Sequence, residues 1–170
     1  MLQFLFRRLT ADPRRGAALF DAVTRLAREP HWYVEGQVLD TLDGRFAMLA
    51  TVTALALSRL EQLGDAANAA SVALTERFIE VMESEHRELG VGDPALGKQV
   101  RRLVGSLARR VELWRDAVAG SEGWLEAARQ SVYTNAVAAG ALAHSSAALE
   151  GLWARLEAAD LEALIGGNVD

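Results

Sequence analysis

The feature that most restricts how this chain can fold is a stretch without any charged residue, from Phe46 to Ser58. A helix over this stretch has no polar face, and such a helix is stable in water only when other elements surround it. Asp40 and Thr41 precede it and are good helix N-caps, and Gly64 interrupts the helical pattern after it. The stretch is too short to cross a membrane, which takes about twenty apolar residues. We therefore predict a central buried helix over about 41–63.

The rest of the sequence also favours helix. Proline, which breaks helices, occurs only at positions 13, 30 and 94, and the first and last of these follow Asp12 and Asp93, a pattern typical of helix starts. We expect an all-α fold, a single compact domain of six to seven helices within 14–165, with an N-terminal segment at 1–13 and a loose tail at 166–170. An ordered loop is expected at 31–40. The other expected helices cover about 14–28, 66–89, 94–119, 122–135, 141–158 and 161–165.

Neither a targeting signal nor a membrane span is expected. Arg7 and Arg8 follow the apolar start of the chain instead of preceding it, which is the wrong order for a secretory signal. The uncharged stretch 130–149 is rich in alanine and contains Asn135 and His144, so it makes a poor span. We expect a soluble protein whose first residues are frayed, or dock on the protein body or on a lipid surface.

The residues that catalysis or metal binding would need do not form a recognisable pattern. The 170-residue sequence has no cysteine and three histidines. Glu83 and His86 have the spacing of half a di-metal site in a helical bundle, but no second pair of this kind occurs. The segment Gly92–Lys98 has the glycine spacing of a phosphate loop, yet Gln99 replaces the hydroxyl residue that would hold magnesium. We predict that the protein is not an enzyme and uses no cofactor or metal.

The helix expected at 94–119 carries a basic face, although the chain has a net charge of −5. At 100° per residue, Lys98, Arg102 and Arg109 project opposite to its apolar stripe. Two interpretations stay open: a solvated face paired to the acidic helix at 66–89, or a contact for ribosomal RNA, phospholipid headgroups or an acidic protein patch. The negative total charge argues against specific DNA binding. The basic residues of this helix are Lys98, Arg101, Arg102, Arg109, Arg110 and Arg115.

Two segments of the sequence have the form of family signatures. In the first, His31–Phe46, an aromatic and glycine-containing stretch leads into an Asp-Thr-x-x-Gly-Arg-Phe helix start, and the second is Arg87–Asp93 with a Gly-Lys pair after it. Together they resemble the ubiquinol–cytochrome c chaperone family. The sequence departs from the family pattern at Gln37, where a glycine is usual, and at Leu39 and 105–108. The signature residues are Trp32, Tyr33, Gly36, Asp40, Thr41, Asp43, Gly44, Arg45, Phe46, Arg87, Glu88, Gly90, Val91, Gly92, Asp93, Gly97 and Lys98.

This resemblance implies a non-enzymatic assembly factor for the cytochrome bc1 complex, in the free-standing form of bacteria. It would bind newly made cytochrome b at the cytoplasmic face of the inner membrane, near the ribosome or an anionic membrane surface, with a second assembly factor or as a homodimer. The alternative is a generic helical adaptor or regulator that binds a soluble protein or nucleic acid through the basic face. Aromatic side chains in a glycine-containing loop could add an exposed apolar patch. The expected partner contacts are Trp32, Tyr33, Lys98, Arg101, Arg102 and Arg109.

Overall fold

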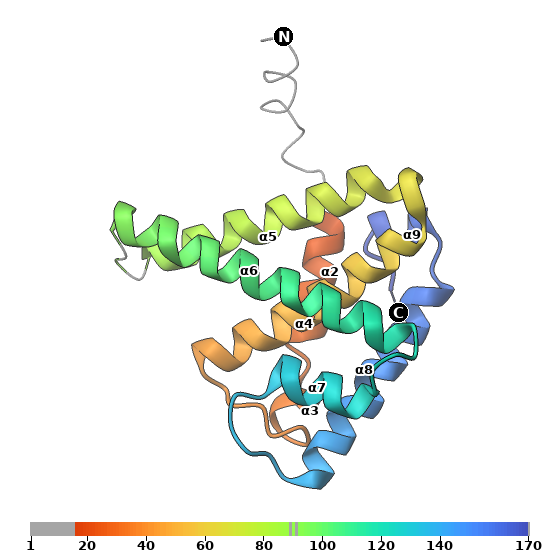
Figure 1. Ribbon diagram of the computed structural model, residues 1–170. Coiled ribbons are helices and arrows are strands. Elements are labelled where there is room, and N and C mark those ends of the chain that lie inside the picture. The colour runs from red at the N-terminus through yellow and green to blue at the C-terminus, as the bar shows by residue number, and fades with distance from the viewer. Residues whose placement is uncertain (1–15, 89, 91, 170) are drawn as a thin grey trace.

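The computed structural model describes residues 16–88, 90 and 92–169, and all regular structure in this part of the chain is helical. The expectation of a single all-α domain is confirmed (Figure 1). The expectations for residues 1–13 lie outside the described residues. The elements are α2 (Ala17–Ala27), α3 (Pro30–Tyr33), α4 (Leu42–Gln62), the 3-10 helix η1 (Gly64–Ala67), α5 (Asn68–Glu88), α6 (Asp93–Val118), α7 (Trp124–Val132), α8 (Ala139–Ala158) and α9 (Leu161–Ile165).

Helix α4 is the central element, as the uncharged stretch predicts. It packs against α2, α5, α6, α7 and α8, and every side chain from Ala50 to Ser58 is buried. Its buried hydroxyl groups have partners, since Thr53 and Ser58 donate to backbone carbonyls one turn earlier at 2.7 and 2.9 Å. Burying one large aliphatic side chain contributes about 1.5–3 kcal/mol, so α4 supplies much of the core energy. Neither α4 nor another helix of the described chain is long and apolar enough to cross a bilayer.

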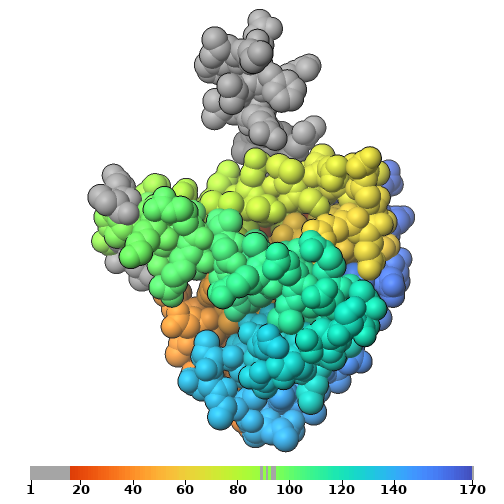
Figure 2. Space-filling view, in the orientation of Figure 1, coloured from red at the N-terminus to blue at the C-terminus, as the bar shows by residue number. Residues whose placement is uncertain are grey.

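Helices α5 and α6 form a long pair whose free end projects beyond the start of α4 (Figure 1). Gly90 lies in the turn between them with φ 82°, a left-handed conformation that favours glycine. One side of α6 is buried, with Leu103, Leu107 and Trp114 in the core. The free end of the pair overhangs α4, and a cleft opens between them (Figure 2).

The predicted loop at 31–40 begins with a helical turn, α3. Pro30 does more than end α2, because it occupies the first turn of α3, where its missing N–H costs no hydrogen bond. A helix this short leaves no periodic pattern in the sequence. The helix predicted at 122–135 is also shorter than expected, since the backbone is extended at Tyr133.

The described residues after α9, 166–169, pack against α2 and the core, which corrects the expectation of a loose tail there. Gly167 has φ 75°, and a Cβ at this position would lie 2.5 Å from the Ala18 carbonyl oxygen. Val169 is buried. Glycine lets the backbone approach α2 closely, and the valine that follows joins the core.

Candidate functional site

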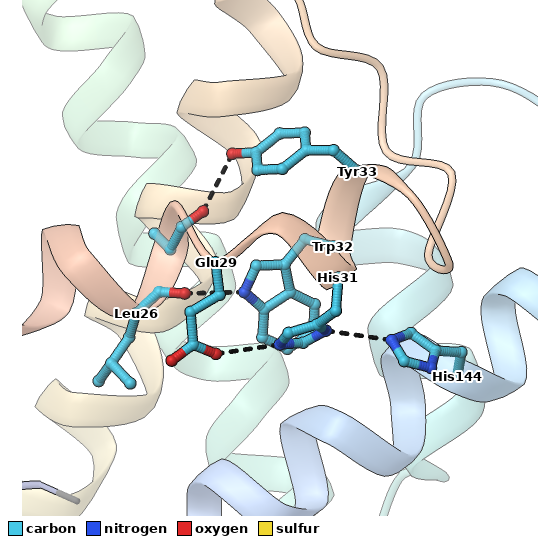
Figure 3. Close-up of polar contacts among 7 residues, drawn as sticks. Leu26, Glu29, His31, Trp32, Tyr33 and His144 are labelled. Atoms are coloured by element: carbon cyan, nitrogen blue, oxygen red, sulfur yellow. Dashed lines mark hydrogen bonds and ion pairs between the residues drawn. The ribbon is translucent and has the colours of Figure 1, made fainter.

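The aromatic residues of the first signature lie inside the protein. Trp32 is 2% exposed, and its indole N–H donates to the Leu26 carbonyl at 2.7 Å (Figure 3). Tyr33 is half-buried, and its hydroxyl donates to the Ala27 carbonyl at 3.0 Å. Burial raises the pKa of Tyr33 above its ordinary value of 10.0, so the hydroxyl keeps its proton. The expectation that Trp32 contributes to an exposed patch is therefore wrong: both residues fix α3 to the end of α2.

A histidine pair that the sequence did not indicate connects α3 to α8. His31 Nδ1 lies 3.0 Å from His144 Nε2, and His31 Nε2 lies 3.0 Å from a carboxylate oxygen of Glu29 (Figure 3). The histidines are 113 positions apart, so no local pattern could pair them. Within the described ranges, no three His, Asp or Glu side chains are arranged to hold a metal. We interpret the contacts among Glu29, His31 and His144 as a structural connection between α3 and α8.

Gly36 continues this connection to α7 and α8. A Cβ at Gly36 would lie 2.5 Å from the Trp32 carbonyl oxygen and 2.6 Å from Ser145 Oγ, so a larger residue does not fit. The Tyr133 hydroxyl donates to the Gly36 carbonyl at 2.6 Å and lies 2.7 Å from Ser145 Oγ. The signature glycine therefore brings the loop close enough for the tyrosine to fix it.

The second half of the first signature builds the start of α4. Thr41 is the N-cap, and its hydroxyl accepts the Gly44 N–H at 3.3 Å. Arg45 Nε donates to Asp40 at 2.6 Å, and this hydrogen bond holds the pKa of Asp40 below its ordinary value of 3.8. A Cβ at Gly44 would clash with the Leu39 carbonyl oxygen. These residues act as a helix cap and an ion pair.

The loop and the first residue of α4 expose apolar side chains. Val34 is 68%, Leu39 58% and Leu42 54% exposed, and we call these three residues the apolar ridge. Gln37 has φ 52°, which is rare for a residue other than glycine. The structure thus gives a physical reason why glycine suits position 37, where this sequence departs from the family pattern.

The second signature lies at the free end of the α5–α6 pair. Gly92 is the N-cap of α6, and Asp93 is the first residue of the helix, not its cap. Val91 lies outside the described residues. Lys98 follows on α6, with Gly97 before it. Exposed residues here are Arg87, Glu88, Gly90, Gly92 and Lys98.

The cleft under this free end brings parts of the two predicted regions together. It has a volume of about 310 Å³. Asp43, Arg45 and Phe46 line it from the first signature, and Arg102 and Arg109 line it from the basic face. Sequence reasoning named all five residues but had no means of placing them around one cavity.

His86 lines the cleft near the free end of the α5–α6 pair. His86 Nδ1 donates to the Met82 carbonyl at 2.8 Å, and His86 Nε2 lies 3.2 Å from the Gln99 side-chain nitrogen. These contacts link α5 to α6. His86 therefore has a structural role beside the cleft.

The basic face is smaller than the sequence predicts. Lys98, Arg101, Arg102 and Arg109 are exposed, and none of them has a hydrogen bond or ion pair to another residue in the described part of the chain. Arg115 instead forms a bidentate ion pair with Glu61 of α4, in which both N···O distances are 3.0 Å. It does not pair with the acidic helix α5.

Arg110 is not part of the exposed basic face either, because its side chain points inward. Its guanidinium donates to the Ser131 carbonyl at 2.8 Å and lies over the Phe46 ring, 5.8 Å from the centroid. Burial, and secondarily the nearby Arg109, lower its pKa to about 10, so it remains charged at neutral pH. Arg110 therefore ties α6 to α7 and α4.

Comparison with solved structures defines the class of protein. The chain matches the crystal structure of the Cbp3 homolog from Brucella abortus with a TM-score of 0.78 and 25% sequence identity, over 99% of this chain and 94% of that chain. No curated protein matches the sequence. The chain is thus similar over its whole length to this all-α, Cbp3-type fold.

The model of the ubiquinol–cytochrome C chaperone family matches residues 34–169. This match covers most of the sequence, and the chain belongs to that family. The resemblance carried by the two signatures is confirmed, and family membership supports a chaperone role.

Proposed function

We propose that this protein is a non-enzymatic chaperone that binds newly made cytochrome b at the cytoplasmic face of the inner membrane and holds it for assembly into the cytochrome bc1 complex. The observation that carries the proposal is the family match over residues 34–169. The Cbp3 homolog, 25% identical over nearly the whole chain, supports it.

The apolar ridge is the surface that suits such a client. A membrane protein that has not reached its final place exposes apolar side chains, and Val34 and Leu39 offer apolar area to them. The loop that carries Val34 and Leu39 is anchored by Trp32, Gly36 and Tyr133. A fixed loop loses little conformational entropy on binding, so more of the contact energy remains for affinity.

The exposed cations of α6 suit an anionic surface. Each basic side chain close to an anionic leaflet contributes about 1 kcal/mol, and ribosomal RNA attracts the same charges. Lys98, Arg101, Arg102 and Arg109 are available for this role because no described residue neutralises them.

Deletion of the gene in its own host tests the proposed function directly. We expect assembled cytochrome bc1 complex and cytochrome b to decrease while the other respiratory complexes stay at their normal levels. Re-expression of the chain should restore them. Normal bc1 levels in the deletion strain would overturn the proposal.

Co-purification of cytochrome b with tagged variants tests the ridge. The double substitution Val34→Glu, Leu39→Glu should abolish co-purification of cytochrome b, because binding an apolar client would bury the two introduced glutamate charges. Val72 and Ile165 are 49% and 48% exposed on other helices, so Val72→Glu, Ile165→Glu is the matched control and should retain it. Equal retention by both variants would exclude the ridge as the client contact.

Charge reversal tests the anionic surface. The triple variant Lys98→Glu, Arg102→Glu, Arg109→Glu should lose association with membranes or ribosomes in sedimentation while its unfolding temperature stays unchanged. The reason is that these side chains are exposed and make no hydrogen bond within the described chain. An unfolded triple variant would show that the face is structural instead.

A further inference from the structure

The cleft beneath the α5–α6 pair contains positive charge that the protein leaves without a partner. Arg28, Arg102 and Arg109 line it, and none of them forms a hydrogen bond or ion pair with any residue that the structure describes. Asp43 and Glu85 are the carboxylates among its lining residues, against four arginines. Guanidinium groups bind phosphate and carboxylate through paired hydrogen bonds, so the cleft suits an anion.

The opposite wall of the cleft is apolar. Leu42, Phe46 and Leu49 lie at positions i, i+4 and i+7 of α4, which places them on one stripe of that helix, and all three line the cleft. Leu103 of α6 and Met82 of α5 face the same space. An occupant must therefore have an apolar part beside its anionic group.

One buried polar atom lies in the wall of the cleft. Thr24 Oγ1 is buried and has no hydrogen-bond partner among the described residues, and Thr24 lines this cleft. A buried polar atom without a partner costs about 1–3 kcal/mol, so this part of the wall lowers the stability of the fold instead of adding to it.

The charge and surroundings of the cleft select the kind of occupant. A membrane-spanning helix of the client is apolar and offers no anionic group to Arg102 and Arg109, which line the cleft. A helix of the client therefore does not match the charge of the cleft. An extended peptide usually binds by adding to a sheet edge, and the described part of this chain contains no strand. An acyl chain needs no backbone partners and is thin enough.

We propose that the cleft binds one molecule of an anionic phospholipid, with its phosphate at Arg102 and Arg109 and the start of an acyl chain against Phe46 and Leu49. The inference rests on the proposed function, since it gives the chaperone a lipid ligand at the membrane where it holds its client. It goes beyond general attraction to a charged surface, because it assigns the binding to one cavity.

Isothermal titration with a soluble lipid tests the cleft without a membrane. The probe is dihexanoylphosphatidylglycerol below its micelle concentration, added to the full chain. We expect saturable binding, at least tenfold weaker with dihexanoylphosphatidylcholine, glycerol 3-phosphate or inorganic phosphate. If either phosphate compound binds as tightly as the lipid, the cleft is a simple anion site and the proposal fails.

Two double alanine variants separate the cleft from the rest of the basic face. Arg102→Ala, Arg109→Ala removes two charges that line the cleft, and Lys98→Ala, Arg101→Ala removes two exposed charges of the same helix that do not line it. We expect at least tenfold weaker lipid binding in the first pair and unchanged binding in the second. If the first pair does not fold, Arg102→Gln, Arg109→Gln takes its place.

The outcomes distinguish this inference from the proposed function. Equal weakening by both pairs would mean diffuse electrostatic binding, which overturns the lipid site but leaves the chaperone role in place. An acidic apolar peptide that displaces the lipid and binds more tightly would make the cleft a polypeptide site and also overturn it. Failure of the chaperone role instead appears as normal bc1 levels in the deletion strain, whatever the lipid binding.

Discussion

Two regions that share the first signature differ in how completely their polar groups are bonded. Around α3, the polar groups of His31, Trp32, Tyr33 and Tyr133 all have partners within the protein. In the cleft, the arginines of α6 and the hydroxyl of Thr24 have none within the described residues. The first region builds the scaffold, and the second is left available for another molecule.

This difference separates stability from binding. Substitutions in the bonded region should lower the free energy of unfolding, because each leaves a buried partner unsatisfied or a cavity. Substitutions of the polar groups without a partner in the cleft, Thr24, Arg102 and Arg109, should leave that free energy unchanged or raise it. The comparison fails if the two regions respond alike.

The largest expected effect is at Trp32. Trp32→Ala removes a 2% exposed indole and should lower the free energy of unfolding by about 3–5 kcal/mol, measured by urea titration. Trp32→Phe keeps most of the packing and loses the bond to Leu26, so it should cost less. A cost below about 1 kcal/mol for Trp32→Ala would show that α3 is not anchored as described.

Tyr133 gives the next largest effect. Tyr133→Phe removes the hydroxyl that bonds the Gly36 carbonyl and Ser145, and should cost about 1–2 kcal/mol. Ser145→Ala should cost a similar amount, and the double variant less than the sum, because both lose the same contact. Additive costs would mean that the two hydroxyls act independently.

The fold could be predicted largely from α4, because a helical stretch as long as Phe46–Ser58 without any charged residue is stable in water only when other elements surround it. The helix cap at Thr41 and the ion pair of Asp40 with Arg45 could also be predicted from the sequence, since both join residues that are close along the chain. The sequence could not predict the contact of His31 with His144, nor that Trp32 is buried, because these depend on how α3 meets distant helices.

The candidate site shows the same division. The basic residues of α6 could be predicted from helical spacing, and Lys98, Arg102 and Arg109 are exposed as expected. The helical period could not show that Arg110 turns inward to Ser131, because the inward turn depends on the position of α7. The cleft itself is formed by four helices and leaves no local pattern.

A substitution at Thr24 in the cleft should raise the free energy of unfolding, whereas the substitutions at Trp32 and Tyr133 lower it. Thr24→Val keeps the shape of the side chain and removes the buried hydroxyl without a partner, so the free energy of unfolding should rise by up to about 1 kcal/mol. Thr75 is the control, because its hydroxyl donates to the Ser71 carbonyl at 2.9 Å and Thr75→Val should not stabilise the protein. A loss of stability in Thr24→Val would show that the hydroxyl already has a partner.

The smallest effect is expected at the exposed pair of Asp40 and Arg45. Arg45 lowers the folded-state pKa of Asp40 below 3.8, so the pair stabilises the folded state above that pH and loses this contribution as the pH falls through the lowered pKa. The difference in urea midpoint between the protein and Asp40→Asn should therefore be small at pH 7, shrink towards pH 3, and shrink further in high salt. Arg45→Gln should reproduce the same pH profile, because either change removes the pair. A difference that persists unchanged at low pH would mean that the Asp40 side chain acts through packing at the start of α4, which would place it with the bonded region and not with the solvent-exposed charges.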